Sequence, residues 1–144
     1  MLPDDVTLED ILPHREAMLL VETVVELSTE HAVTRSVVSS RWPMADAHGV
    51  DALMLVELAA QTAGVNNGWK NRLKNGPTAY HVGWIVGIKS ARILIGRLQI
   101  GTTVVVESRN RFEYDQLMEV HAIARIDEKT VAEVVLQLME ADAP

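Results

Sequence analysis

The sequence contains no cysteine among its 144 residues, which excludes disulfide bonds, thiolate metal ligands and a cysteine nucleophile. Aromatic residues make up only 4% of the chain, so few aromatic side chains are available to line a ligand pocket. No group of His, Asp and Glu has the spacing of a metal site, and no glycine-rich loop of the phosphate-binding kind occurs. We therefore expect neither a metal nor an organic cofactor.

Positive charge is also scarce, because 13 Lys and Arg residues accompany 20 Asp and Glu residues and leave a net charge of −7. Such an acidic chain has no general attraction for nucleic acid or for an anionic membrane. No apolar run reaches the roughly 20 residues of a membrane-spanning helix. Residues 1–10 lack the basic and apolar regions of a signal peptide. We expect a cytoplasmic protein that binds neither nucleic acid nor membrane.

The length and the 48% apolar content are those of one globular domain, spanning residues 1–144. Thr7, with an acid three residues later, predicts the start of a short helix. Residues 18–27 and 31–40 have the pattern of two strands joined by a turn at 28–30. Further β-branched runs, punctuated by turn residues, follow Pro77 at 80–95, 102–114, 117–127 and 130–140.

The segment 51–74 lacks proline and predicts one long helix, with Asp51 near its start and Asn75-Gly76-Pro77 as its stop. Its first fifteen residues are apolar or small almost all round, whereas a surface helix is polar on one face. We therefore expect the first half of this helix to be buried on nearly every side. The simplest architecture that achieves this is an α+β fold in which an antiparallel sheet of about six strands wraps round the helix.

Glu57 and Gln61 are the strongly polar residues of that apolar stretch, and their spacing of four places them on one helix face. A carboxylate is costly to bury as an anion. Glu57 therefore either belongs to a narrow solvated stripe or has an environment suited to acid–base chemistry. The helix pattern alone leaves both interpretations open.

Several segments, in the right order along the chain, resemble the 3-hydroxyacyl-acyl-carrier-protein dehydratases of fatty acid synthesis. They are Leu12-Pro13-His14-Arg15 with Met18-Leu19-Leu20-Val21-Glu22, the helix segment Val56-Glu57-Leu58-Ala59-Ala60-Gln61, the strand segment Val86-Gly87-Ile88-Lys89-Ser90-Ala91-Arg92, and finally Gly101 with Val131-Ala132-Glu133. The resemblance implies a hotdog fold, a homodimer or larger homo-oligomer, and sites at the dimer interface. It also implies an acyl thioester on acyl-carrier protein or coenzyme A as the substrate, with Glu57 as the catalytic acid and Gln61 beside it.

One departure from the family concerns its catalytic histidine, which lies in an H-F-P-G segment fourteen residues before the glutamate. Pro43 occupies that position here, and the nearest histidine is His48. The chain is similar in this respect to divergent dehydratase-like proteins of polyene pathways. We expect His48 to act with Glu57, reaching across a dimer, and we expect His14 to have a structural role in the N-terminal turn.

His48-Gly49 also resembles the H-G-G motif of hotdog acyl-CoA thioesterases, although Val50 replaces the second glycine. Backbone N–H groups around residues 49–52 are candidates to polarise the thioester carbonyl. The residues expected to contact substrate are Gly49, Val50, Leu53, Gln61 and Trp84, with Val56 and Ile85 as further lining for the acyl chain. Basic residues that could meet phosphopantetheine or an acidic carrier are Lys70, Arg72, Lys74, Lys89, Arg92 and Arg97, most of which we expect to be ordinary solvated charges.

The sequence thus predicts an enzyme that removes water from a 3-hydroxyacyl thioester to give the 2-enoyl thioester, in fatty acid or polyene-type synthesis. Two alternatives remain. A thioesterase would use the same Glu57 and His48 to activate water. A non-catalytic subunit would pair with an active dehydratase, and the missing H-F-P-G segment favours that reading.

Overall fold

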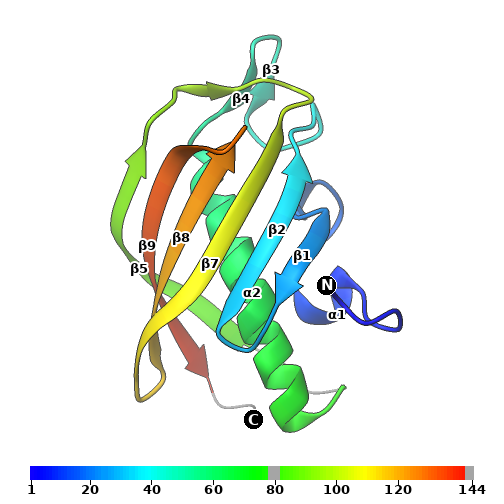
Figure 1. The fold of residues 1–144 in the computed structure, drawn as a ribbon, viewed down its shortest axis with the longest axis vertical. Helices are drawn as coiled ribbons and strands as arrows, with labels where there is room; N and C mark the ends of the chain where they lie inside the picture. The colour runs from blue at the N-terminus through cyan, green and yellow to red at the C-terminus, as the bar shows by residue number, and fades with distance from the viewer. Residues whose placement is uncertain (78–81, 142–144) are drawn as a thin grey trace.

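The computed structural model describes residues 1–77 and 82–141. Six strands form one antiparallel sheet that curves round a single long helix, α2 (Met54–Asn75) (Figure 1). In spatial order the strands are β1 (Thr23–Leu27), β2 (His31–Val37), β7 (Thr103–Tyr114), β8 (Leu117–Ile126), β9 (Lys129–Ala141) and β5 (Val82–Ile93). This arrangement is the hotdog fold and confirms the α+β architecture predicted from the sequence.

The remaining elements are short. They are α1 (Leu8–Ile11), a 3₁₀ turn (Glu16–Met18), and a small second sheet of β3 (Ala45–Asp46), β4 (Gly49–Asp51) and β6 (Arg97–Leu98). The Asp10 carboxylate accepts hydrogen bonds from both the backbone and the hydroxyl of Thr7, which confirms the predicted helix start. Within residues 1–77 and 82–141, no helix is long and apolar enough to cross a membrane.

The core lies between the concave face of the sheet and α2. Alternate residues of the sheet point inward, as the period of a strand requires. The fully or almost fully buried side chains include Val104 and Val106 of β7, Val120 and Ala122 of β8, Ala132, Val134 and Leu136 of β9, and Leu55, Leu58 and Ala59 of α2. The expected burial of the first half of the helix is therefore confirmed, except for a partly exposed stripe that includes Val56, Glu57 and Ala60.

The helix begins three residues later than the sequence predicted. Asp51 is the last residue of β4 and pairs with Arg97 of β6, so its backbone belongs to the small sheet. Its carboxylate accepts a hydrogen bond from the Leu53 N–H at 2.9 Å and closes the turn that leads into α2. The predicted stop is confirmed, since Gly76 caps the helix with a φ of 95°.

The predicted first strand is also shorter, because residues 18–22 do not join the sheet. The Leu20 and Val21 N–H groups donate to the side-chain oxygen of Gln61, at 2.8 and 3.3 Å, instead of to a neighbouring strand. A helix side chain therefore replaces the sheet partner that the apolar pattern of this segment suggested, and β1 starts only at Thr23.

The N-terminal segment lies along one face of α2, and two glycines allow it to approach closely. A Cβ on Gly64 would lie 2.8 Å from the end of the Leu12 side chain. A Cβ on Gly68 would collide with the Ile11 side chain and lie 2.8 Å from the Ile11 carbonyl oxygen. We call residues 8–21 the N-terminal strap, because they run over the helix from Gly68 to Gln61.

We expect Gly68→Ala to destabilise the protein by about 1–3 kcal/mol, the usual cost of overpacking a well-packed site. The added methyl group meets backbone at Ile11, so the strap itself must move. Gly64→Ala is the matched control, since its methyl group meets only the flexible end of Leu12, and a smaller loss is expected. Urea unfolding of both variants measures the difference, and equal losses would contradict this packing.

Candidate active site

The carboxylate of Glu57 lies on the face of α2 that the strap covers, and it is partly open to solvent. Its Oε1 atom lies 3.2 Å from Nε2 of His14 and accepts a hydrogen bond from Nε2 of Gln61 at 3.0 Å. The side chains of His14 and Glu57 are 28% and 31% exposed, so a substrate can still reach the pair. No described residue bonds Oε2, which is therefore available to a ligand.

Gln61 connects this carboxylate to the strap. The residue is fully buried, yet its amide is satisfied on both sides. Its oxygen accepts from Leu20 and Val21, and its nitrogen donates to the Met18 carbonyl at 2.7 Å and to Glu57. Gln61 therefore orients the Glu57 carboxylate from the protein interior, and the Gln61 side chain itself is not exposed to solvent.

Arg15 fixes the part of the strap that carries His14. Its guanidinium bends back and donates to the carbonyls of Leu12 and His14, at 2.7 and 2.8 Å, and to the Glu9 carbonyl at 3.0 Å. Leu12 packs against α2 at Gly64, as described above. The four residues Leu12-Pro13-His14-Arg15 thus act together to place an imidazole over Glu57.

His48 lies elsewhere, in the exposed turn between β3 and β4. Its backbone N–H donates to the Asp46 carboxylate at 2.7 Å, and Asp46 also pairs with Arg97 at 2.6 Å. The hydrogen bond from His48 lowers the pKa of Asp46, burial opposes this effect, and the Arg97 charge lowers the pKa further. Within one described chain, His14 and not His48 contacts Glu57, and a role for His48 across a dimer stays a prediction.

The sequence alone predicts a structural role for His14 in the N-terminal turn and does not place this histidine over Glu57. Thr7 and Asp10 cap α1, while the His14 ring reaches Glu57 on α2, a contact that the predicted structural role did not include. The motif Leu12-Pro13-His14-Arg15 was the signal that could have found it, since it marks His14 as part of a family pattern rather than an isolated loop residue.

Gly49 and Val50 have packing roles that explain their identity. Gly49 has a φ of 116°, and a Cβ there would collide with the carbonyl oxygen of Leu98, so only glycine fits comfortably. Val50 is fully buried in the main core. Their predicted contact with substrate stays a prediction, but neither residue presents an open side-chain surface.

The residues expected to line the acyl chain are spread over α2 and β5. Leu53 is 54% exposed, Ile85 is 45% exposed, and Val56 is partly buried on the same helix face as Ala60. Trp84 pairs with Met139 in the sheet, but its side chain lies outside the described residues. Of these predicted lining residues, Leu53 and Ile85 have apolar side chains that are clearly exposed.

The backbone donors predicted around residues 49–52 are partly in use. The Ala52 N–H donates to the carbonyl of Gly96 at 3.1 Å. This N–H is therefore not available to polarise a thioester carbonyl, because its hydrogen bond to Gly96 holds the segment that leads into α2.

Three of the six candidate basic residues form ion pairs within this chain. Lys70 pairs with Glu30 and Glu113, Lys89 pairs with Glu119, and Arg97 pairs with Asp46. The Lys70 pKa is raised: burial opposes the rise, but the two glutamates outweigh it. These three side chains are paired within the chain, so the expectation that most of the six are ordinary solvated charges stays a prediction for the others.

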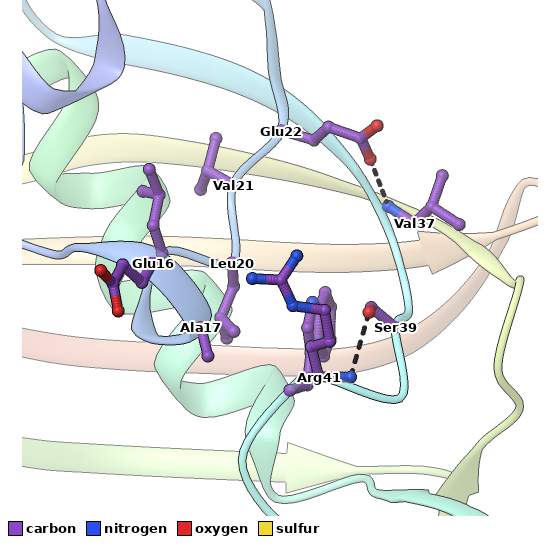
Figure 2. A pocket seen from close by; sticks show the side chains of 10 residues that line it. Glu16, Ala17, Leu20, Val21, Glu22, Val37, Ser39 and Arg41 are labelled. Carbon is purple, nitrogen blue, oxygen red and sulfur yellow. Dashed lines mark hydrogen bonds between the residues drawn. The ribbon is translucent and has the colours of Figure 1, made fainter.

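An open pocket of about 380 Å³ lies beside the strap (Figure 2). Figure 2 shows the Arg41 side chain extending into it, with Glu22 turned away to accept a hydrogen bond from the Val37 N–H at 3.0 Å. Leu20 and Val21 line the pocket, and their backbone N–H groups bond to Gln61. Glu57 is not among the lining residues, so this pocket is separate from the carboxylate site.

The fold and this site together define the class: a hotdog-fold protein whose central helix presents a hydrogen-bonded carboxylate at a partly open surface. A family model described as "ApeP-like: ApeP dehydratase" matches residues 6–144. The chain belongs to this dehydratase family, which confirms the resemblance and the prediction of an enzyme that removes water.

One relative agrees with this assignment, and two solved structures share the fold. The chain is 28% identical over 130 residues to the 3-hydroxyacyl-[acyl-carrier-protein] dehydratase FabZ of Streptococcus uberis, covering 87% of this chain and 89% of that protein. The dehydratase heterocomplex ApeI:P from Xenorhabdus doucetiae contains a chain with a TM-score of 0.84 and 18% identity, covering 95% of this chain and 92% of that one. A hypothetical thioesterase with coenzyme A from Streptococcus pneumoniae has a TM-score of 0.67 and 10% identity, covering 84% and 86%. These last two show the fold alone.

Proposed function

We propose that this protein dehydrates a 3-hydroxyacyl thioester, carried by acyl-carrier protein or coenzyme A, to the 2-enoyl thioester. The observation that carries the proposal is the Glu57 carboxylate: its Oε1 accepts a hydrogen bond from Gln61 and lies 3.2 Å from Nε2 of His14, and no described residue bonds its Oε2. Membership of a dehydratase family and the similarity to the S. uberis enzyme support it. We further propose a cytoplasmic location and a place in fatty acid or polyene-type synthesis.

The chemistry follows from having one open carboxylate oxygen. Oε2 of Glu57 takes the proton from the carbon next to the thioester carbonyl, which that carbonyl makes acidic. The same oxygen then returns the proton to the hydroxyl on the next carbon. The C–O bond breaks, water leaves, and the carbon–carbon double bond forms. Glu57 ends as the carboxylate in which it began, so the reaction needs no cofactor.

We also propose a homodimer formed along β5. This strand has twelve residues and, in the part of the chain that the structure describes, one neighbour, β9, which leaves a long edge of backbone groups open. Ile85, Val86 and Ile88 on it are 45%, 51% and 53% exposed. The other edge strand, β1, has five residues and an irregular register, both of which discourage pairing. A second copy is therefore better placed at β5 than at β1.

We expect Ile88→Lys to weaken self-association roughly tenfold or more, because burying an unpaired ammonium costs more than ~1.4 kcal/mol. Val25→Lys is the matched control on the other edge strand, where a residue of similar exposure should tolerate the charge. Sedimentation equilibrium of both variants measures the effect. If the dimer dissociated in Val25→Lys but not in Ile88→Lys, the interface would lie at β1 instead.

The proposal is tested by mass spectrometry after the purified protein is incubated with a 3-hydroxyacyl thioester of pantetheine. Loss of one water from the intact thioester supports it. Release of the free acid and thiol would instead show a thioesterase. A non-catalytic partner would show no activity alone. It would give activity only after a second dehydratase subunit is added, and Glu57→Gln in this chain would not lower that activity.

A further inference from the structure

His14 has an environment that fixes which of its ring nitrogens carries hydrogen. Its Nε2 lies 3.2 Å from Oε1 of Glu57. Its Nδ1 is buried and has no hydrogen-bond partner among residues 1–77 and 82–141. A proton on Nδ1 would be buried without an acceptor, which is costly. The favoured tautomer of the neutral ring therefore carries its single N–H on Nε2 and donates it to Glu57.

This donor complements the one from Gln61, and both meet the same carboxylate oxygen. Gln61 Nε2 lies 3.0 Å from Oε1. Two N–H groups on Oε1 prevent the carboxyl group from rotating freely, and they leave Oε2 as the oxygen that faces a ligand. A reacting group held in one orientation gains rate because less freedom is lost on reaching the transition state.

We propose that His14 is a positioning residue that holds the Glu57 carboxylate in the orientation needed for dehydration. This chain thereby orients Glu57 although it lacks a histidine at the H-F-P-G position. The inference rests on the proposed function. His14 acts through Oε1 and does not itself exchange a proton with the substrate. Its own placement comes from the strap, where Arg15 binds the His14 carbonyl and Leu12 packs on Gly64.

The kinetic test compares His14→Ala with His14→Gln. The glutamine amide can offer an N–H close to where Nε2 lies but cannot carry a proton in catalysis. We expect His14→Ala to lower kcat about 10- to 100-fold with little change in KM. His14→Gln should restore most of kcat. Equal losses in both variants, with folding intact, would overturn the positioning role in favour of proton transfer by His14.

His121→Gln is the matched control, because His121 Nε2 lies 3.2 Å from Glu119 on the outer face of the sheet. This pair has the same separation as His14 and Glu57 but lies away from the site, so kcat should be unchanged. A loss of kcat in His121→Gln as large as that in His14→Ala would show that the assay reports general stability, and it would overturn the specific role of His14.

A second measurement does not depend on activity. Long-range ¹H–¹⁵N correlation spectra of the histidine rings should show the hydrogen of the neutral His14 ring on Nε2. Hydrogen on Nδ1 of the neutral ring would overturn the inference even if the enzyme is active. Absence of any dehydration by the wild-type protein would count against the proposed function, whereas this spectrum would still decide the state of His14.

Discussion

Glu57→Gln should lower kcat for dehydration by roughly 10²- to 10⁴-fold, the range that acid–base side chains contribute. The amide has the same shape as the carboxylate and can still accept the hydrogen bonds from His14 and Gln61. It cannot take up the proton that the reaction requires. Substrate affinity should change little, so KM stays close to that of the wild type. Initial rates of enoyl thioester formation measure both constants.

The control for this variant is Glu133→Gln, which removes one exposed carboxylate from β9 and the same formal charge. Its kcat should equal that of the wild type. A Glu57 variant with at least a third of wild-type kcat would contradict the assignment, and it would point to acid–base chemistry supplied from another chain.

Gln61→Leu should be the most destabilising single change in the site, at about 3–5 kcal/mol. The leucine has a similar volume but leaves two N–H groups and one carbonyl of the strap without partners. Each buried polar group that loses its partner costs about 1–3 kcal/mol. Urea unfolding monitored by circular dichroism measures the loss, and a change below 1 kcal/mol would contradict the role given to Gln61.

Gln61→Glu tests the donor that Gln61 offers to Glu57. A carboxylate at this position keeps the acceptor for Leu20 and Val21, but it loses the donors to the Met18 carbonyl and to Glu57 and places a like charge beside Glu57. Because a fully buried carboxylate next to a second one is costly, we expect this variant to lose stability as well as kcat. Full activity in a folded Gln61→Glu protein would show that the donor to Glu57 is dispensable.

The helix and the strands could be predicted because their signals are local. Residues 51–74 are apolar on nearly every side, and the β-branched runs alternate as strands do. Asp127 and Glu128 both have positive φ, at 50° and 66°, so the turn predicted there is a two-residue hairpin turn. Hydrophobic periodicity is sufficient for elements of this kind.

The strap could not be predicted from local pattern, because it depends on partners distant in the sequence. Residues 18–22 are as apolar as a strand, but the Leu20 and Val21 N–H groups bond to the side chain of Gln61 instead of to a neighbouring strand. For the same reason Glu57 and Gln61 were recognised on one helix face, but His14 was not placed with them. His48 was favoured by its nearness in sequence to Glu57, which says little about distance in a folded chain.

The central claim is reversible dehydration at Glu57, and heavy-oxygen water tests it most directly. The wild-type protein is incubated with a 3-hydroxyacyl thioester in H₂¹⁸O, and the position of the label is read by tandem mass spectrometry. Reversible loss and return of water predicts ¹⁸O in the hydroxyl of the intact thioester, and no such label with Glu57→Gln. Label in the carboxylate of a released acid, or an unlabelled hydroxyl with folded wild-type protein, would contradict the claim.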